Sequence, residues 1–347
     1  MDNFKSNLQK PISCNFGCNV IFARFSTSSM NKFKQKIAAR ESGILLYGIT
    51  PPKAGTEDEK LQQIAEKTIE RISGLPIDGL IVYDVQDEKE RTNEDRPFPY
   101  ITAMDPLTYV SEYLTSLNVA KIVYRPVGIH AEESLLSWMG QLHFGGHTPV
   151  LVGMPSPDFV PKTSLDRAYE LSISHFGTDW PFGGVMIPER HFSLGGEEER
   201  ILQKENKGVA FFVSQCVFHV ENCIALINEV SAAARNQDRR PPYMIFTLTT
   251  CGSLKTLGFM EWLGIFIPED IKEEFLISQN LLQTSFNVVI RIAEALILAC
   301  KKQGIPFGFN IESVAIRKDE IEASIELTNE VRRLLEKHEI IVPAYEM

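Results

Sequence analysis

The chain has 347 residues, of which 44% are hydrophobic, so it is long and apolar enough to bury a full core. Its formal net charge is -10 and its Lys and Arg residues are dispersed, which argues against a surface that neutralises nucleic-acid phosphates. Its apolar runs have the length of strands or core helices rather than of a bilayer span. We expect a small-molecule partner, and neither a nucleic acid nor a membrane, while the oligomeric state stays open.

The cysteines indicate a reducing compartment. All 6 of them lack the paired C-x-x-C spacing of a structural zinc site or a redox motif. Cys14 and Cys18 are closely spaced, but no second pair of ligands follows them, and the histidines show no ligand spacing with cysteines or carboxylates. We therefore expect no metal site and a cytoplasmic location.

Residues 1–40 form a basic segment in which Asp2 is the single acid and 25–29 is rich in serine. This composition fits a mitochondrial transit peptide, which would place the protein in the mitochondrial matrix. The alternatives are a disordered extension, or an upstream start codon with Met30 as the working initiator. In each case we expect residues 1–40 to lie outside the fold.

From residue 41 onward, strand-like and helix-like segments alternate. The expected strands are almost continuously apolar, as are strands that are covered on both faces. They are 44–50, 79–85, 121–127, 149–154, 184–188, 209–215, 244–250 and 307–313.

Amphipathic segments follow these strands, the clearest over 61–72, where apolar residues recur at helical spacing. Eight strand and helix pairs in one chain predict a single (β/α)8 TIM barrel over 41–347. An open doubly wound sheet is the alternative, but it needs a Gly-rich turn where this chain has Pro51 and Pro52. Further helices are expected at 105–117, 131–141, 163–175, 196–206, 220–235, 254–264 and 317–337, with a helical insertion at about 269–303.

Polar residues at the carboxyl ends of the strands are the candidate functional residues, because a barrel of this kind directs them into one mouth. Asp84 opens a charged stretch over 84–96, which as a solvated loop would have no function. Glu189 is a candidate for acid or base chemistry, or for a loop ion pair, and so is His191. The other candidates, all at strand ends, are Tyr124, Gln215, Thr249 and Glu312.

Several stretches together, spanning about 44–330, resemble the methylenetetrahydrofolate reductase family. The most telling stretch is 203–218, in which a lysine-containing helix leads through a Gly turn into a strand that ends near a glutamine and is followed by an aromatic residue. The family consists of (β/α)8 barrels that reduce a folate-bound one-carbon unit with NAD(P)H, usually through FAD, in one-carbon metabolism and methionine biosynthesis. Further matches occur at Pro51-Pro52, Pro188-Glu189 with His191, 268–275 and 307–313.

The resemblance implies roles for individual residues. Gln215 and the aromatic Phe218 would contact the folate, and we add Asp84 and Thr249 as substrate contacts at neighbouring strand ends. Lys204 corresponds to a flavin contact, and His191 and Tyr124 would also lie on the cofactor side.

Three departures from the family pattern concern its chemistry. The position of the family's general-acid glutamate is Gly48, the Arg-Gly-Asp of its fourth strand is Val152-Gly153-Met154, and its flavin-contacting histidine is replaced near Tyr124. The chain therefore resembles the non-canonical, flavin-independent branch, in which NAD(P)H is expected and FAD is in question.

The expected function is reduction of a methylenetetrahydrofolate-like substrate by NAD(P)H. In a closed barrel the last strand neighbours the first, so Glu312 can lie beside Gly48 and replace the missing acid, with Glu189 as the second candidate. A tetrahydrofolate-dependent methyltransferase and a non-catalytic folate-binding paralogue are the alternatives.

Overall fold

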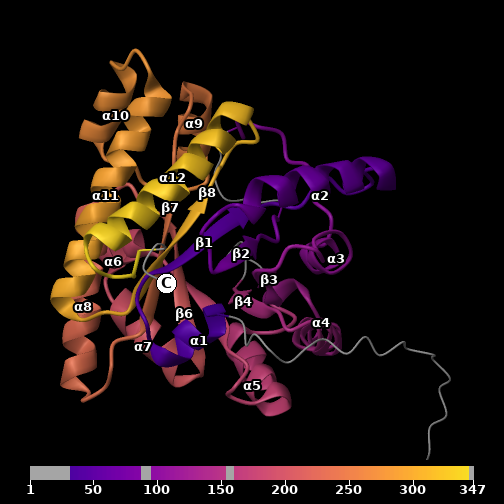
Figure 1. Cartoon of the computed structure of the whole chain (residues 1–347). Helices are drawn as coiled ribbons and strands as arrows, with labels where there is room; N and C mark the ends of the chain where they lie inside the picture. The colour runs from indigo at the N-terminus through magenta and orange to yellow at the C-terminus, as the bar shows by residue number, and fades with distance from the viewer. Residues whose placement is uncertain (1–31, 87–94, 154–159, 344–347) are drawn as a thin grey trace, which may run out of the picture. The chain divides into compact units, whose positions relative to one another are not determined.

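A computed structural model describes residues 32–86, 95–153 and 160–343 of the chain. Its eight strands are all parallel and form a closed barrel in sequence order (Figure 1). This confirms the predicted (β/α)8 barrel. The strands are β1 (Ile44–Ile49), β2 (Gly79–Val82), β3 (Ala120–Pro126), β4 (Thr148–Val152), β5 (Phe182–Met186), β6 (Val209–Cys216), β7 (Tyr243–Thr249) and β8 (Phe307–Glu312).

Helices follow the strands close to the predicted ranges, with three differences. Residues 105–117 form only a short helix, α3 (Pro106–Thr108), that runs into a π-helical turn over Tyr109–Tyr113, and the short α6 (Pro188–Leu194) was not predicted. The other helices are α2 (Asp58–Ser73), α4 (Glu132–Phe144), α5 (Leu165–Phe176), α7 (Glu197–Asn206), α8 (Val220–Asn236), α9 (Leu254–Trp262), α10 (Glu269–Leu276), α11 (Leu281–Gln303) and α12 (Lys318–Lys337), and a 3-10 turn spans Val127–Ile129.

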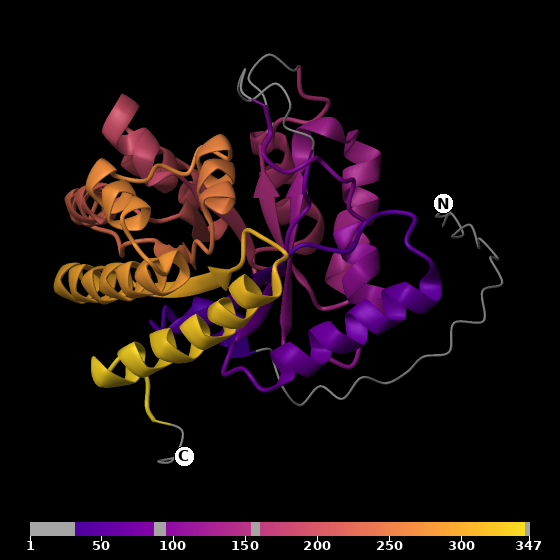
Figure 2. The ribbon, with the colours of Figure 1, turned by 90° about the horizontal axis from the view of Figure 1, so that it is seen from above.

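The third difference concerns the expected insertion at 269–303. Helix α11 packs against β7 and between α8 and α12, so it occupies the place of the seventh barrel helix. Figure 2 shows the long α11 and α12 lying side by side. The additional helices are therefore α9 and α10, which come between the end of β7 and α11.

Helix α11 also has the length and hydropathy of a membrane-spanning helix. Its buried residues, among them Val288, Ile292 and Leu296, belong to the core that lies between the strands and the helices. In this structure the apolar face of α11 is thus covered by the barrel.

The interior of the barrel has a core of its own. Side chains of a strand alternate between its two faces, so every second residue of each strand points inward. Leu46 on β1, Ile81 on β2 and Ile122 on β3 are among these inward residues, and none has exposed surface. This interior core sets the level at which the polar residues of the mouth begin.

Helix α1 (Lys32–Ala39) packs on the interior core at the amino ends of the strands, below the barrel in Figure 1. Phe33 is fully buried and meets Phe211 of β6 edge-on, with 5.3 Å between ring centroids. Lys36 forms a buried ion pair with Asp78 at 2.9 Å. The predicted boundary at residue 40 is wrong, because a short helix with one apolar face closes this end of the barrel.

We predict that Phe33→Ala lowers the free energy of unfolding by about 3–5 kcal/mol, since it leaves a cavity under the barrel. Urea denaturation followed by circular dichroism measures this change. Gln35→Ala, at an exposed position of the same helix, is the matched control and should leave stability within about 0.5 kcal/mol of the parent. Equal stabilities for all three proteins would show that α1 does not close the barrel.

Candidate functional site

A polar layer lies above the interior core, at the carboxyl ends of the strands. Its centre is Glu312, the last residue of β8, whose register partners are Gly48 on β1 and Thr249 on β7. Both Tyr83, just after β2, and Cys216, at the end of β6, donate hydrogen bonds to its carboxyl group, the latter at 3.2 Å. Residues from four different strands or their ends thus converge on one carboxyl group.

Asn310 lies two residues before Glu312 on β8, on the same face of the strand, and belongs to the same layer. Its side-chain nitrogen donates to the Tyr83 hydroxyl at 2.8 Å and approaches Thr247 and Glu312 at 3.3 Å each. Its carbonyl oxygen is buried and has no hydrogen-bond partner among the described residues. A buried acceptor of this kind is free to receive a hydrogen bond from a ligand or a water molecule.

Gly48 leaves room that its neighbours occupy. A Cβ atom added there would lie 3.0 Å from the Tyr83 ring and 3.2 Å from the Cβ of Glu312. Glu312 therefore lies beside Gly48, as the closed barrel predicted. The space itself is taken by Tyr83, whose ring also packs against Tyr124 with 4.8 Å between centroids.

Burial sets the protonation behaviour of this layer. It raises the pKa of Glu312, and the hydrogen bonds from Tyr83, Cys216 and Asn310 oppose this shift without cancelling it. Burial and the nearby Glu312 carboxyl also raise the pKa of Cys216 and Tyr83 well above their usual values. Glu312 is thus the group of this layer that is suited to gain and lose a proton.

Glu189 is a second carboxyl group near the mouth. It lies in the first turn of α6, and neither of its buried oxygens has a partner among the described residues. Burial raises its pKa. Burial is also the main cause of the raised pKa values of Cys216 and Cys223, to which the charge of Glu189 adds. His191 of the same helix lies 3.0 Å from Glu198, so it takes part in a local contact rather than in the Glu312 layer.

Three aromatic side chains that the sequence analysis did not indicate lie close together in the segments that follow β5, β6 and β7. We call Phe192, His219 and Phe266 the aromatic rim. The His219 ring lies 6.2 Å from that of Phe192 and 5.4 Å from that of Phe266, measured between centroids. Phe192 and Phe266 are both largely exposed. Nearby, the Gln215 side chain donates to the Leu263 carbonyl at 2.9 Å, which leaves its own carbonyl oxygen as an acceptor.

Three predicted contacts lie elsewhere. Asp84 turns away from the mouth and pairs with Arg125 at 2.9 Å. Phe218 is fully buried against Phe275 in this structure, and its contact with substrate stays a prediction. Lys204 donates to the Val185 carbonyl at 2.9 Å, and its role as a cofactor contact is not supported because its amine already holds a strand.

The remaining candidates lie in or near the polar layer. Thr249 is fully buried in register with Glu312, and Tyr124 lies in the interior core. Tyr83 and Cys216 were missed. The strand period could have found Tyr83, because Ile81 points inward and residues two apart share a face. Cys216 faces Glu312 because the register between β6 and β7 shifts after Val213, and no sequence pattern predicts such a shift.

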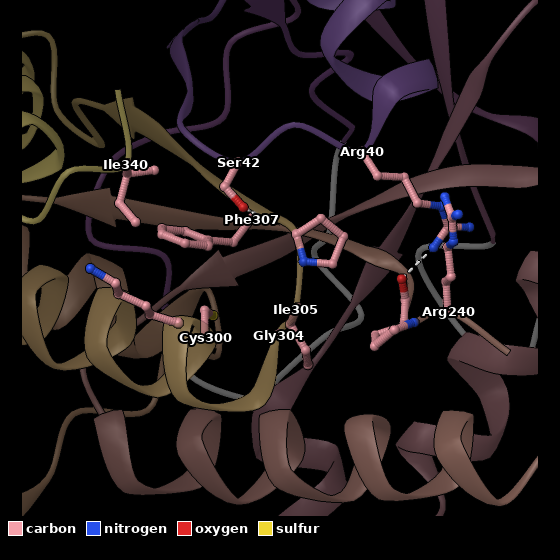
Figure 3. Close-up of a pocket in the computed structure, with 11 residues that line it drawn as sticks. Arg40, Ser42, Arg240, Cys300, Gly304, Ile305, Phe307 and Ile340 are labelled. Atoms are coloured by element: carbon pink, nitrogen blue, oxygen red, sulfur yellow. Dashed lines mark hydrogen bonds between the residues drawn. The ribbon is translucent and has the colours of Figure 1, made fainter. Parts of the chain in front are cut away.

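A pocket of about 320 Å³ lies at the opposite end of the barrel. Figure 3 shows Arg40 and Arg240 on one side of it and Cys300 and Phe307 on the other. Arg40 is already engaged by Glu205 at 2.8 Å and by the Pro241 carbonyl. Active sites of this fold lie at the carboxyl ends of the strands, so we assign no role in catalysis to this pocket.

No group of three or more His, Cys, Asp or Glu side chains in the described ranges has the arrangement of a metal site. The sequence matches no model of a protein family, and a comparison with curated proteins finds no match.

One solved structure is a relative in sequence as well as in fold. It is an uncharacterized protein from Clostridium thermocellum that binds two copies of 5-methyl-5,6,7,8-tetrahydrofolic acid. The two chains are 39% identical, the match covers 87% of this chain and 99% of that one, and the TM-score is 0.76. The chain belongs to the same family as this protein. The comparison supports the folate part of the predicted resemblance and leaves the reductase part as a proposal.

Other solved structures resemble the chain more weakly. An oxaloacetate acetylhydrolase is 11% identical over 91% of this chain and 90% of its own, with a TM-score of 0.45. A tryptophan synthase from M. tuberculosis is 11% identical over 87% of this chain and 96% of its own, with a TM-score of 0.46. Likenesses at this level carry no argument about function.

The raised pKa of Glu312 makes stability depend on pH. The protonated carboxyl contributes stability fully below its unfolded pKa of about 4.3, and that contribution is lost as pH rises through the higher folded pKa. Because glutamine stays neutral, the melting temperature of Glu312→Gln minus that of the parent should increase from pH 4.5 to pH 8. Differential scanning calorimetry measures this, with the exposed Glu322→Gln as control. A difference that stays flat across this range would contradict the raised pKa.

Proposed function

We propose that the barrel mouth binds a reduced folate and that the protein reduces a methylene group on it with NAD(P)H. The observation that carries the proposal is Glu312, a buried carboxyl with a raised pKa at the centre of the mouth, in a chain 39% identical to a tetrahydrofolate-binding barrel. Because that relative binds two copies of its folate, we further propose more than one ligand position in this chain.

The proposed reaction needs a proton donor in the mouth, and Glu312 is our candidate for it. Protonation of N10 opens the five-membered ring of 5,10-methylenetetrahydrofolate, because it breaks the bond between N10 and the methylene carbon. Hydride from NAD(P)H then adds to that carbon, which leaves 5-methyltetrahydrofolate and NAD(P)⁺. Glu312 can hold the proton because burial favours its neutral form, and Tyr83 fixes its orientation.

Two other features support binding of a folate. The free carbonyl oxygens of Gln215 and Asn310 can accept hydrogen bonds from the N–H groups of a pterin ring. The rim of Phe192, His219 and Phe266 offers aromatic faces for the aminobenzoyl part of the ligand.

The residues at the expected flavin positions do not fit a flavin. Lys204 is held by the Val185 carbonyl, Tyr124 is buried in the interior core against Tyr83, and the side chain of Val152 carries no charge. We therefore propose direct transfer from NAD(P)H, with the nicotinamide nucleotide as a second substrate.

A binding protein without catalysis is the second candidate. The hydrogen bonds from Tyr83 and Cys216 occupy the two oxygens of Glu312 and favour this candidate, since the bond at the oxygen that carries the proton must give way before the carboxyl can protonate a substrate. Such a protein would bind 5-methyltetrahydrofolate and show no turnover with either nicotinamide nucleotide.

The decisive experiment is NADH and NADPH oxidation with 5,10-methylenetetrahydrofolate, comparing the parent with Glu312→Gln. We expect kcat to fall at least about 100-fold, because general acid catalysis typically contributes 100- to 10,000-fold. Calorimetry with 5-methyltetrahydrofolate should give similar dissociation constants for the two proteins.

The exposed Glu322→Gln serves as the matched control and should keep the parent's kcat. Undiminished turnover in Glu312→Gln would remove Glu312 from the mechanism. Folate binding without turnover in the parent would favour the binding protein, and absence of folate binding would contradict both candidates.

A further inference from the structure

A second pocket, of about 450 Å³, lies on the outer side of β3, between α3 with its π-helical turn and α4. It is separate from the polar layer of the mouth. Tyr124 and Arg125 are consecutive in β3, so they point to opposite faces of the strand: Tyr124 belongs to the interior core and Arg125 lines this pocket. The residues that the argument uses are Asp105, Glu112, Arg125, His130, Ser134 and Trp138.

Three buried nitrogen atoms of this pocket have no hydrogen-bond partner among the described residues. They are Nε of Arg125, Nε1 of Trp138 and Nε2 of His130. Arg125 and Trp138 are only 8% and 7% exposed, so water does not readily replace the missing partners. The N–H groups of Arg125 and Trp138 can only donate. Unpartnered buried donors are costly, so two of them at one cavity indicate that an acceptor atom belongs there.

Arg125 is fixed in place. Its two terminal nitrogens bind Asp84 at 2.9 Å and Asp105 at 2.7 Å, and its guanidinium lies 4.6 Å from the centroid of the Trp138 ring. With both ends held, the remaining Nε–H has a fixed direction. Arg125 and Trp138 thus form one rigid wall that presents donors.

The charges around the pocket limit what it can bind. Among the side chains that line the pocket, Asp105 and Glu112 carry two negative charges against the one positive charge of Arg125, so the lining does not favour an anion. A cation would leave the donor nitrogens unpartnered. Burial opposes ionisation of Asp105, but the positive charge of Arg125, together with hydrogen bonds from Arg125 and backbone groups, lowers its pKa. Asp105 therefore stays ionised and accepts hydrogen bonds. The pocket therefore suits a neutral group that carries an acceptor beside an N–H donor.

We propose that this pocket is a second ligand site that binds a neutral amide attached to a planar ring, its carbonyl oxygen toward Arg125 and Trp138 and its N–H toward Asp105. The 4-oxo and N3–H edge of a pterin has this chemistry, and so does the carboxamide of nicotinamide. The choice of these two sources rests on the proposed function, whereas the site itself rests on the pocket.

Calorimetric titration of the full-length protein with pterin and, separately, with nicotinamide tests the site. We expect at least one probe to bind the parent, and Trp138→Phe to weaken that binding about fivefold, the effect of one neutral hydrogen bond. The matched control is Trp180→Phe, which removes the same indole N–H from a tryptophan that donates to the His147 carbonyl at 2.8 Å. This control should lower the melting temperature and leave probe binding unchanged.

Ser134→Phe is the second variant. Ser134 is an exposed residue that lines the pocket, so a larger side chain there should block the probe without disturbing the core. Binding of pterin alone or of nicotinamide alone identifies the source, and binding of both supports the shared chemistry.

Failure of both probes to bind, or binding that Trp138→Phe and Ser134→Phe leave unchanged, would overturn the proposal. Glu312→Gln separates this test from the proposed function, because it should leave probe binding intact even if it abolishes turnover. Probe binding that is lost only in Glu312→Gln would place the ligand in the mouth and would also overturn the second site.

Discussion

Burial of the Glu312 carboxyl is the constraint on which the mouth of the barrel depends. In a closed parallel barrel every second side chain of a strand points inward, and on β8 this alternation includes the last residue, Glu312. A carboxylate there is costly unless donors surround it, and Tyr83, Cys216 and Asn310 supply them. The same burial raises the pKa of Glu312, so one environment both fixes the position of this carboxyl group and favours its neutral form.

This constraint also accounts for Gly48. An acid on β1 would need the space that the Tyr83 ring occupies, and it would place a second carboxyl group beside Glu312. Two carboxyl groups that lie side by side disfavour each other's ionisation. If the proposed reduction holds, Glu312 on β8 supplies the proton that the reductase resemblance assigns to the position of Gly48 on β1.

The sequence predicted the fold well because the strands are buried on both faces and therefore read as continuous apolar runs. It misplaced the amino-terminal boundary, since the lysines of α1 resemble those of a leader, whereas the deciding residues are only Phe33 and Ile37. It found Glu312 and Thr249 because strand ends are easy to locate. It selected Asp84 rather than Tyr83 because Asp84 begins a charged stretch, whereas the inward face of β2 is given by the alternation of side chains along the strand. The bulge that turns Cys216 inward, the aromatic rim and the Arg125 pocket depend on contacts between distant segments, which no local pattern records.

A crystal structure of the protein with 5-methyltetrahydrofolate tests the central claim most directly. The account predicts a pterin ring at the carboxyl ends of the strands, with Glu312 and the carbonyl oxygen of Gln215 within hydrogen-bond distance of its nitrogens. A folate bound only at the amino end of the barrel, or a mouth in which Tyr83 and Glu312 remain paired with no ligand above them, would contradict it.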